Sequence, residues 1–290
     1  PTLLLNSHHD TVFPNEAYTR DPFIAEIVDG KLFGLGSNDA GGSLVSLIAL
    51  FTHYYEHTNP TYNLLMVASA EEEIAGEKSL RSLIPYLPKI DLAIIGEPTN
   101  MELAVAEKGL IVFDLNIKGT PSHAAHPNED NPLMKIPEVI EKIKNISFDK
   151  NSTLLGPVKI TLSQINAGNQ HNVVPSEVKM VLDVRVNECY KNSEINNLIV
   201  SSLPCDVKAR SLHLESSSID ENHALVIAGK KLGRSTYGSP TLSDQAALSC
   251  PSLKLGPGDS KRSHTADEFI YIHEIEDGIK LYIDLLKQIL

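Results

Sequence analysis

The chain has 290 residues, 42% hydrophobic and 21% charged, a balance typical of folded globular proteins that excludes disordered and fibrous classes. Its 25 basic and 37 acidic side chains give a net charge of −12, which argues against a nucleic-acid partner because such partners need Lys and Arg to neutralise phosphates. The longest apolar runs are much shorter than the roughly 20 residues that cross a bilayer, so we expect no membrane partner.

The three cysteines are widely spaced and odd in number, which favours neither a disulfide framework nor a thiolate zinc site: Cys189, Cys205 and Cys250. We therefore expect a protein of the reducing cytoplasm. The chain starts at Pro1 and enters an apolar run at once, so we also expect that a further N-terminal portion precedes it in the natural protein.

The first hundred residues alternate short apolar runs with a helical pattern, which is typical of βαβ units and a largely parallel sheet. The predicted strands are Thr2–Ser7, Asn63–Ala70 and Leu92–Gly96. Between the first two, Gly41–His57 has the spacing of a helix, with apolar positions at Leu44, Leu47, Ile48 and Phe51.

From about Leu110 the pattern changes to that of a small α+β domain. Its predicted strands are Ile111–Ile117, Val158–Ile165, Val178–Val186 and Asp206–Leu214, and its predicted helices are Pro132–Ile146 and Asn192–Leu203. The parallel-sheet pattern resumes after Ser216, with helices predicted at Asn222–Leu232 and Ile272–Leu290. We thus expect an α/β fold in which residues 1–109 and 217–290 form one domain and residues 110–216 are inserted into it.

Polar, chemically active residues follow each predicted strand of the first domain. They are His8-His9-Asp10, Glu71-Glu72-Glu73 and Glu97-Pro98. Because ligands bind at the carboxyl ends of strands in open α/β sheets, we expect these three groups to converge on one edge.

A divalent metal is the natural partner for such a group, since neighbouring carboxylates otherwise repel each other and raise each other's pKa. Asp39 lies in Gly36-Ser37-Asn38-Asp39-Ala40-Gly41-Gly42, just before a predicted helix, where glycines permit close backbone approach, and it could bridge two ions. The mixture of histidine and carboxylate suits zinc, cobalt or manganese better than calcium or magnesium.

Each residue alone has a simpler interpretation. A Glu triplet is usually a solvated helix start, His8 alone a hydrogen-bonded core histidine, and Asp39 alone an N-cap. Their joint placement favours the metal site. Nucleophilic and nucleotide-binding motifs do not compete with it, because no G-x-S-x-G elbow occurs and Gly34-Leu35-Gly36 fits neither the dinucleotide fingerprint nor the P-loop.

These residues resemble the motifs of the M20 metallopeptidase and deacylase family. The family's H-x-D motif matches His8-His9-Asp10, its Asp before a Gly pair matches Asp39, and its Glu-Glu pair matches Glu72-Glu73. Two further motifs match Gly96-Glu97-Pro98-Thr99 and Ser263-His264-Thr265-Ala266-Asp267-Glu268, so the resemblance covers nearly the whole chain.

The resemblance implies a role for each of these residues. One ion would be held by His8, Asp39 and Glu97, and a second by Asp39, Glu73 and His264. Asp10 would orient His8 from the second shell of the metal, and Glu72 would act as general base. The triplet leaves a second register open, in which the pair is Glu71 and Glu72.

The resemblance also implies that the inserted domain is a ferredoxin-like lid through which the protein forms a homodimer. His123, in Gly119-Thr120-Pro121-Ser122-His123, would stabilise the oxyanion in the active site of the partner subunit. Asn172, in Asn172-Val173-Val174-Pro175, would contact substrate. Arg185, in Asp183-Val184-Arg185, would either contact substrate or serve the fold.

The implied activity is that of a zinc-peptidase-like, two-metal amidohydrolase, with Zn²⁺ or Co²⁺, acting on a small N-acyl amino acid. The motif variants look most like deacetylases of arginine biosynthesis, with acetylornithine or acetyl- or succinylcitrulline as substrate. A dipeptidase or carboxypeptidase and a succinyl-diaminopimelate desuccinylase are the alternatives. Desuccinylases typically have an Arg two residues after a Ser-Asp pair, and here Ser243-Asp244 is followed by Gln245-Ala246. A catalytically silent binding module is disfavoured because every expected ligand type is present.

Overall fold

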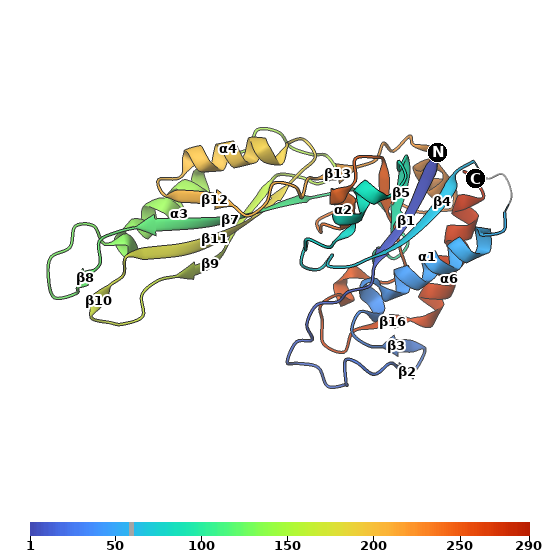
Figure 1. The fold of residues 1–290 in the computed structure, drawn as a ribbon, viewed down its shortest axis with the longest axis horizontal. Helices are drawn as coiled ribbons and strands as arrows, with labels where there is room; N and C mark the ends of the chain where they lie inside the picture. Colours follow the sequence, from blue (N-terminus) through green and yellow to red (C-terminus); the bar gives the residue numbers. More distant parts are fainter. Residues whose placement is uncertain (58–60) are drawn as a thin grey trace. The chain divides into compact units, whose positions relative to one another are not determined.

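The computed structural model describes residues 1–57 and 61–290. The chain forms two compact units (Figure 1). The first contains Pro1–Ala106, Ser217–Ser239 and Ser243–Leu290, and the second contains Glu107–Ser216 with Pro240–Leu242. The sequence-based boundaries, after residues 109 and 216, lie beside these transitions, and the role of the second unit as a lid remains a prediction.

A mixed, mostly parallel sheet forms the centre of the first unit. Its strand order is β13-β6-β15-β5-β1-β4, with β14 also pairing with β6. The bounds are β1 Thr2–His8, β4 Asn63–Ser69, β5 Leu92–Ile95, β6 Leu103–Glu107, β13 Ser217–Ser218, β14 Thr236–Ser239 and β15 Ser252–Lys254. Strand β1 is parallel to both β4 and β5, and β5 is parallel to β15, whereas β15 and β6 are antiparallel. This confirms the expected α/β class.

Helices cover both faces of this sheet, which is why β1 is buried along its whole length. On one face α1 (Gly42–Tyr54), α5 (Ala224–Lys231) and α6 (Ile272–Leu286) enclose a core with Leu3 and Leu5. On the other face Leu4 packs with Leu80 of the short α2 (Leu80–Leu83), which is followed by a 3₁₀ turn at Ile84–Tyr86. Successive side chains of β1 therefore point to opposite faces of the sheet and contribute to both cores.

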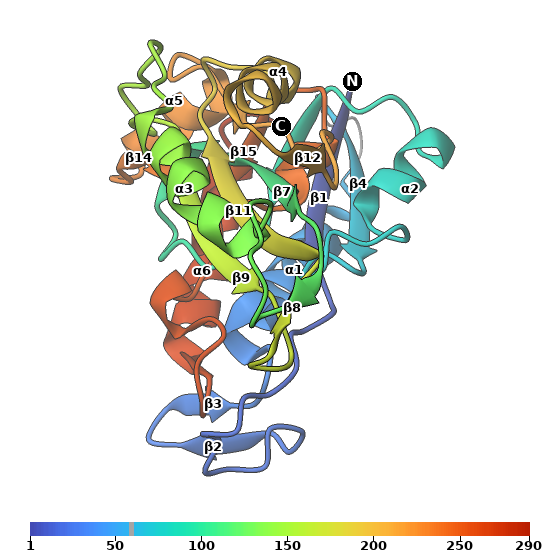
Figure 2. The same cartoon turned by 90° about the vertical axis from the view of Figure 1, so that its left-hand side faces the viewer.

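A small antiparallel sheet, absent from the sequence-based prediction, lies beside the first turn of α6 (Figures 1 and 2). Its order is β16-β3-β2, formed by Phe269–Tyr271, Lys31–Phe33 and Glu26–Val28. Cations stack on its rings, with Arg20 4.1 Å from the Phe33 centroid and Lys31 4.5 Å from that of Phe269. The sheet connects the segment before α1 to the segment before α6.

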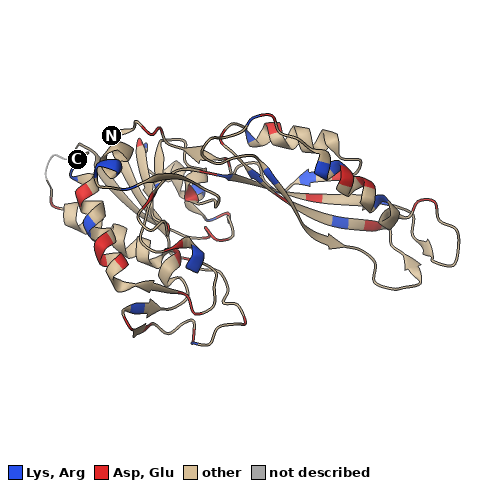
Figure 3. Ribbon diagram, turned by 180° about the vertical axis from the view of Figure 1, so that it is seen from behind, with Lys and Arg blue, Asp and Glu red and all other residues tan. Residues whose placement is uncertain are grey.

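The second unit has a ferredoxin-like chain order, βαββαβ. Its antiparallel sheet runs β12-β7-β11-β9, with β7 Gly109–Lys118, β9 Lys159–Asn166, β11 Glu177–Val186 and β12 Asp206–Ala209. One face packs against α3 (Ile136–Asn145, after a 3₁₀ turn at Pro132–Lys135) and α4 (Asn192–Ser202). Figure 3 marks both basic and acidic positions along the strands of this unit, and several of these residues form ion pairs, including Arg210–Asp114 at 2.8 Å and Arg185–Asp183 at 2.8 Å.

Several predicted elements end earlier in the structure, and the largest differences are at the ends of β12 and α6. Strand β12 ends at Ala209 rather than Leu214, because the Asn192 side chain donates hydrogen bonds to the carbonyls of Leu212 and Leu214 and draws this segment toward the start of α4. The helix predicted to run to Leu290 ends at Leu286. Within the ranges described, no helix is both long and apolar enough to cross a membrane.

Candidate active site

The three polar groups predicted to converge do so at one edge of the central sheet. His8 is the last residue of β1, Glu71–Glu73 follow β4, and Glu97 follows β5. Because β5, β1 and β4 are neighbours and parallel, their carboxyl ends coincide, and His8 pairs in register with Ser69. The sheet thus places a buried imidazole, 1% exposed, between two acidic strand ends.

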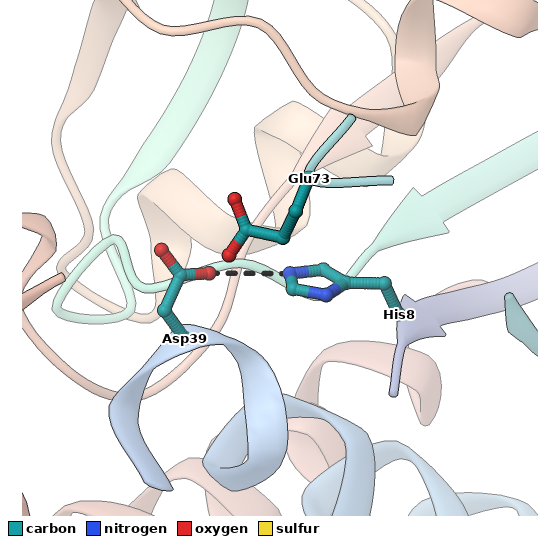
Figure 4. A group of neighbouring side chains, drawn as sticks. All are labelled: His8, Asp39 and Glu73. Atoms are coloured by element: carbon teal, nitrogen blue, oxygen red, sulfur yellow. Dashed lines mark hydrogen bonds and ion pairs between the residues drawn. The ribbon is translucent and has the colours of Figure 1, made fainter. Parts of the chain in front are cut away.

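Asp39 reaches this edge from a tight turn, Ser37–Gly41, that leads into α1. His8 Nε2 lies 3.2 Å from Asp39 Oδ1 (Figure 4). The glycines after Asp39 are needed for close packing. A Cβ on Gly41 would lie 2.6 Å from the Gly36 carbonyl oxygen, and one on Gly42 would lie 2.3 Å from an Ile270 methyl group.

His264 joins the site from the loop between a 3₁₀ turn at Ser260–Arg262 and β16. Its Nε2 lies 3.0 Å from Glu73 Oε2 and 3.6 Å from Asp39 Oδ2. Its side chain is 54% exposed, in contrast to the buried His8. The site therefore has a closed side at His8 and an open side at His264.

The potential ligand atoms form two compact groups that share His8. Those of His8, Asp39 and Glu73 lie within 4.8 Å of one another, as do those of His8, Glu72 and Glu97. The division implied by the resemblance cuts across these groups. Some of its pairs are close together: His8 Nε2 lies 3.8 Å from Glu97 Oε1, and Asp39 lies 3.2 Å from His8 Nε2 and 3.6 Å from His264 Nε2. Asp39 is thus the carboxylate that lies between His8 and His264.

Electrostatic strain in this site is evident from the pKa values. Burial, followed by the charges of Asp244, Glu73 and Asp39, raises the pKa of Glu72 to about 8, against a lowering effect of His8. Burial and the Glu72 charge raise the pKa of Glu97 well above its usual value. Burial lowers the pKa of His8, but the hydrogen bond to Asp39 and the surrounding carboxylates outweigh it and raise the value to about 11. The carboxylates of the site thus lie close enough together, and are buried deeply enough, to disfavour one another's ionised form.

A divalent metal fits this arrangement. Such an ion supplies the missing positive charge, and the donor set of two imidazoles and several carboxylates is one that zinc and related transition metals accept. The clustering of the ligand atoms within 4.8 Å is an observation independent of charge that agrees with this chemistry.

Asp10 lies next to His8, where the resemblance expects its carboxylate to orient the ring, and it has additional contacts. The His8 Nδ1 atom lies 2.9 Å from the backbone carbonyl of Asp10 and 3.6 Å from its carboxylate. The carboxylate also accepts the backbone N–H groups of Glu72 and Glu73, both at 3.3 Å. Asp10 therefore connects the end of β1 to the acidic turn after β4.

The three glutamates of the triplet have different surroundings. Glu71 has a positive φ of 55°, and its carboxylate accepts the backbone N–H of Lys78 at 2.8 Å. Glu72 lies with His8 and Glu97, and Glu73 with His8 and Asp39. This geometry favours the register in which Glu72 and Glu73 form the functional pair.

Two buried carboxylates next to the site lie in segments named in the sequence analysis but were assigned no contact there. Asp244 accepts hydrogen bonds from Asn6 Nδ2 at 2.9 Å and Ser69 Oγ at 2.5 Å, beneath the ends of β1 and β4. Glu268 accepts backbone N–H groups of the Asp39 turn. Both lie far along the chain from their partners, so their contacts could not be predicted, although Glu268 is the last residue of the segment Ser263–Glu268 that resembles a family motif.

The remaining predicted residues belong to the second unit. His123 lies in β8 (Ser122–His123), which pairs with β10 (Val173–Val174), and the backbone of Asn172 accepts the Ala124 N–H at 2.9 Å. The structure thus brings His123 and Asn172 together on one exposed ribbon. Arg185 lies on the sheet face opposite the helices and forms a two-pronged ion pair with Asp183, at 2.8 and 3.0 Å.

Comparisons of the sequence and of the fold with known proteins lead to the same family. The profile described as Peptidase family M20/M25/M40 matches residues 4–288. A succinyl-diaminopimelate desuccinylase from Wolbachia pipientis is 27% identical over 99% of this chain and 78% of its own, and an acetylornithine deacetylase from Shigella sonnei is 28% identical over 98% and 79%. The crystal structure of an M20 family metallo-carboxypeptidase from Sulfolobus solfataricus superposes with a TM-score of 0.80 at 19% identity, covering 99% of this chain and 84% of that one.

Proposed function

The chain belongs to peptidase family M20/M25/M40, whose members are metal-dependent amide hydrolases, and we propose that it hydrolyses the amide bond of an N-acyl amino acid. The products are a carboxylate and a free amino acid. The observation that carries this proposal is the convergence of His8, Asp39, Glu72, Glu73, Glu97 and His264 at the carboxyl edge of the sheet.

His8, Asp39 and Glu97 would hold one divalent ion, and Asp39, Glu73 and His264 a second. Zn²⁺ is the ion that the donor set favours, with Co²⁺ as an alternative. When bound, the ions supply positive charge that polarises the amide carbonyl and favours ionisation of water. Four distances support the two sets. His8 Nε2 lies 3.2 Å from Asp39 and 3.8 Å from Glu97, and His264 Nε2 lies 3.0 Å from Glu73 and 3.6 Å from Asp39.

Glu72 is the proposed general base. It takes a proton from the water that attacks the carbonyl carbon, and it returns this proton to the leaving nitrogen as the C–N bond breaks. Its buried position and the surrounding carboxylates raise its pKa to about 8. A bound cation would lower this pKa and so favour the ionised carboxylate that accepts the proton. Water and amide are consumed, and no covalent intermediate with the protein is required.

His123 is the proposed stabiliser of the oxyanion, acting in the active site of a partner subunit in a homodimer. The Ala125 N–H donates to His123 Nδ1 at 3.1 Å, so the neutral ring has its proton on Nε2. An Nε2–H group is a hydrogen-bond donor suited to a developing negative charge. Asn172, on the same ribbon, is a proposed substrate contact, whereas the Asp183 ion pair favours the structural role for Arg185.

The acyl group and amino acid are the finer part of the proposal. We propose acetylornithine or an acetyl- or succinylcitrulline, substrates of arginine biosynthesis, because the relatives include an acetylornithine deacetylase. Succinyl-diaminopimelate is a second candidate of equal support from the relatives, among which desuccinylases recur. Ala246 is the observation against it, because it occupies the position where the desuccinylases typically have Arg.

A substrate panel tests this choice. The Zn²⁺- and Co²⁺-loaded enzyme is assayed with acetylornithine, acetylcitrulline, succinylcitrulline, succinyl-diaminopimelate and dipeptides, and kcat/KM is compared. The proposal expects the highest value for an acetylated or succinylated ornithine or citrulline. A preference for dipeptides would make the protein an exopeptidase, and a preference for succinyl-diaminopimelate would assign the second candidate.

A further inference from the structure

Glu268 lies four residues after His264, and its side chain reaches the turn that contains Asp39. Glu268 is buried, 2% exposed, and immediately precedes β16. Oε1 accepts the backbone N–H groups of Asn38 at 2.9 Å and Asp39 at 2.8 Å, and Oε2 accepts that of Gly36 at 3.1 Å. A single carboxylate therefore binds three N–H groups of one short turn.

The same segment contacts this turn at a second point. The Asn38 side chain donates to the Asp259 carbonyl at 3.0 Å and accepts the Asp259 N–H at 3.1 Å. The approach is close, since a Cβ on Gly258 would lie 2.6 Å from Asn38 Oδ1. The backbone carbonyl of Glu268 also accepts the Gly34 N–H at 3.1 Å. Residues 258–268 thus hold residues 34–39 at both ends.

Asp39 needs this support because helix geometry does not hold its backbone. Its φ of −119° and ψ of 96° are not helical, and neither are the φ of −122° and ψ of 33° of the following Ala40. Its N–H group would otherwise have to find another partner in a buried site. Charged acceptors form stronger hydrogen bonds to N–H groups than neutral ones, so the carboxylate is well suited to hold this conformation.

We propose that Glu268 is a positioning residue whose carboxylate holds the Gly36–Asp39 backbone so that the Asp39 side chain lies between His8 and His264. This inference rests on the proposed function of Asp39 as a metal ligand. It also explains why one segment contains both His264 and Glu268: the segment provides one ligand and orients another. Loss of such an outer contact typically weakens metal affinity about 10- to 100-fold.

The test is Glu268→Gln, which preserves the shape of the side chain but replaces one acceptor oxygen with an NH₂ group facing the backbone donors. Amide hydrogen exchange of residues 34–41 is measured in metal-free protein, and Co²⁺ affinity is measured by calorimetry. We expect faster exchange in this segment and Co²⁺ affinity weakened about 10- to 100-fold. Glu215→Gln is the matched control, because Glu215 accepts the Asn192 N–H in the second unit, and it should leave both quantities unchanged.

Asp39→Asn separates the two proposals. If Asp39→Asn binds Co²⁺ as tightly as wild type, the proposed ligand set is wrong. If Asp39→Asn weakens binding but Glu268→Gln matches wild type in exchange and affinity, the role of Glu268 is overturned. Should Glu268→Gln not fold, Glu268→Asp, which retains the charge on a shorter side chain, takes its place: weakened affinity supports the role, and wild-type affinity overturns it.

Discussion

The carboxylate of Asp10 accepts the backbone N–H of Glu73 at 3.3 Å, which connects the end of β1 to the acidic turn after β4. The same carboxylate accepts the Glu72 N–H, while the backbone carbonyl of Asp10 contacts His8 Nδ1. Asp10 therefore supports two proposed metal ligands, His8 and Glu73, and the proposed base, Glu72.

Asp10→Ala should weaken metal binding more than a surface substitution does. Without its carboxylate the N–H groups of Glu72 and Glu73 lose their acceptor, so both side chains gain freedom. We expect metal affinity and kcat each to fall about 10- to 100-fold. Calorimetric metal titration measures the first and steady-state kinetics the second. Asp21→Ala is a control, because Asp21 accepts the Phe23 N–H in an exposed loop; equal effects of the two variants would contradict the role of Asp10.

Glu71 and Glu72 provide a matched pair for the general base. Glu72→Gln should reduce kcat about 10²- to 10⁴-fold with metal content unchanged, because it removes proton transfer but keeps the shape of the side chain. Glu71→Gln should leave kcat within a few-fold of wild type, since its carboxylate contacts the Lys78 backbone. Kinetics and elemental analysis on both variants check this. The reverse result would establish the alternative register of the triplet.

The metal-free protein should lose stability as the pH rises. In the folded state the pKa of Glu72 is raised, mainly by burial, from 4.5 to about 8, and that of Glu97 is also raised by burial. The pKa of His8 is raised from 6.5 to about 11, because its carboxylate neighbours outweigh burial. Between its ordinary and raised pKa, each group binds more protons when folded, so unfolding becomes easier as pH increases.

Denaturant unfolding of metal-free protein at about pH 5, 6.5 and 8 measures this effect. We expect the free energy of unfolding to decrease across the series, with a shallower slope in Glu72→Gln. The stability that bound metal adds should instead increase as the pH rises, because ligands must be deprotonated to bind the ion. A metal-free protein that is equally or more stable at pH 8 would contradict the charge balance described for the site.

Mixing two inactive variants tests whether His123 acts on a partner subunit. Glu72→Gln and His123→Ala chains are refolded together, and each mixed dimer then contains one site with both Glu72 and a partner's His123. With random pairing, about a quarter of wild-type activity should return. Each variant refolded alone is the control. If no activity returns although mixed dimers form, His123 does not act in trans.

The strand-end part of the site was predictable because buried strands have a strong local signal. The apolar run Leu3–Leu5 indicated β1, and the polar group His8-His9-Asp10 lies at the end of this strand. The same holds for Glu97 after β5, and the glycines around Asp39 indicated a tight approach to the helix start. Parallel strands then bring these residues together without any further information.

The rest depends on contacts between distant segments. Strands β2, β3 and β16 have three residues each, too few for periodicity to be visible, yet they position the segment with His264 and Glu268. Asp244 bonds Asn6 across 238 positions, and Glu268 bonds Asp39 across 229. The His264 backbone, at φ 61°, is set by this packing and not by the residue's own preference.

Metal stoichiometry measured together with activity in wild type and Asp39→Asn tests the central claim most directly. Asp39 lies between His8 and His264, so its loss should affect both ions. We predict about two ions per wild-type chain with hydrolysis of an N-acyl amino acid, and loss of both bound metal and hydrolysis in Asp39→Asn. Full hydrolysis by chelator-treated wild-type protein, or full metal content and turnover in Asp39→Asn, would contradict a two-metal site centred on Asp39.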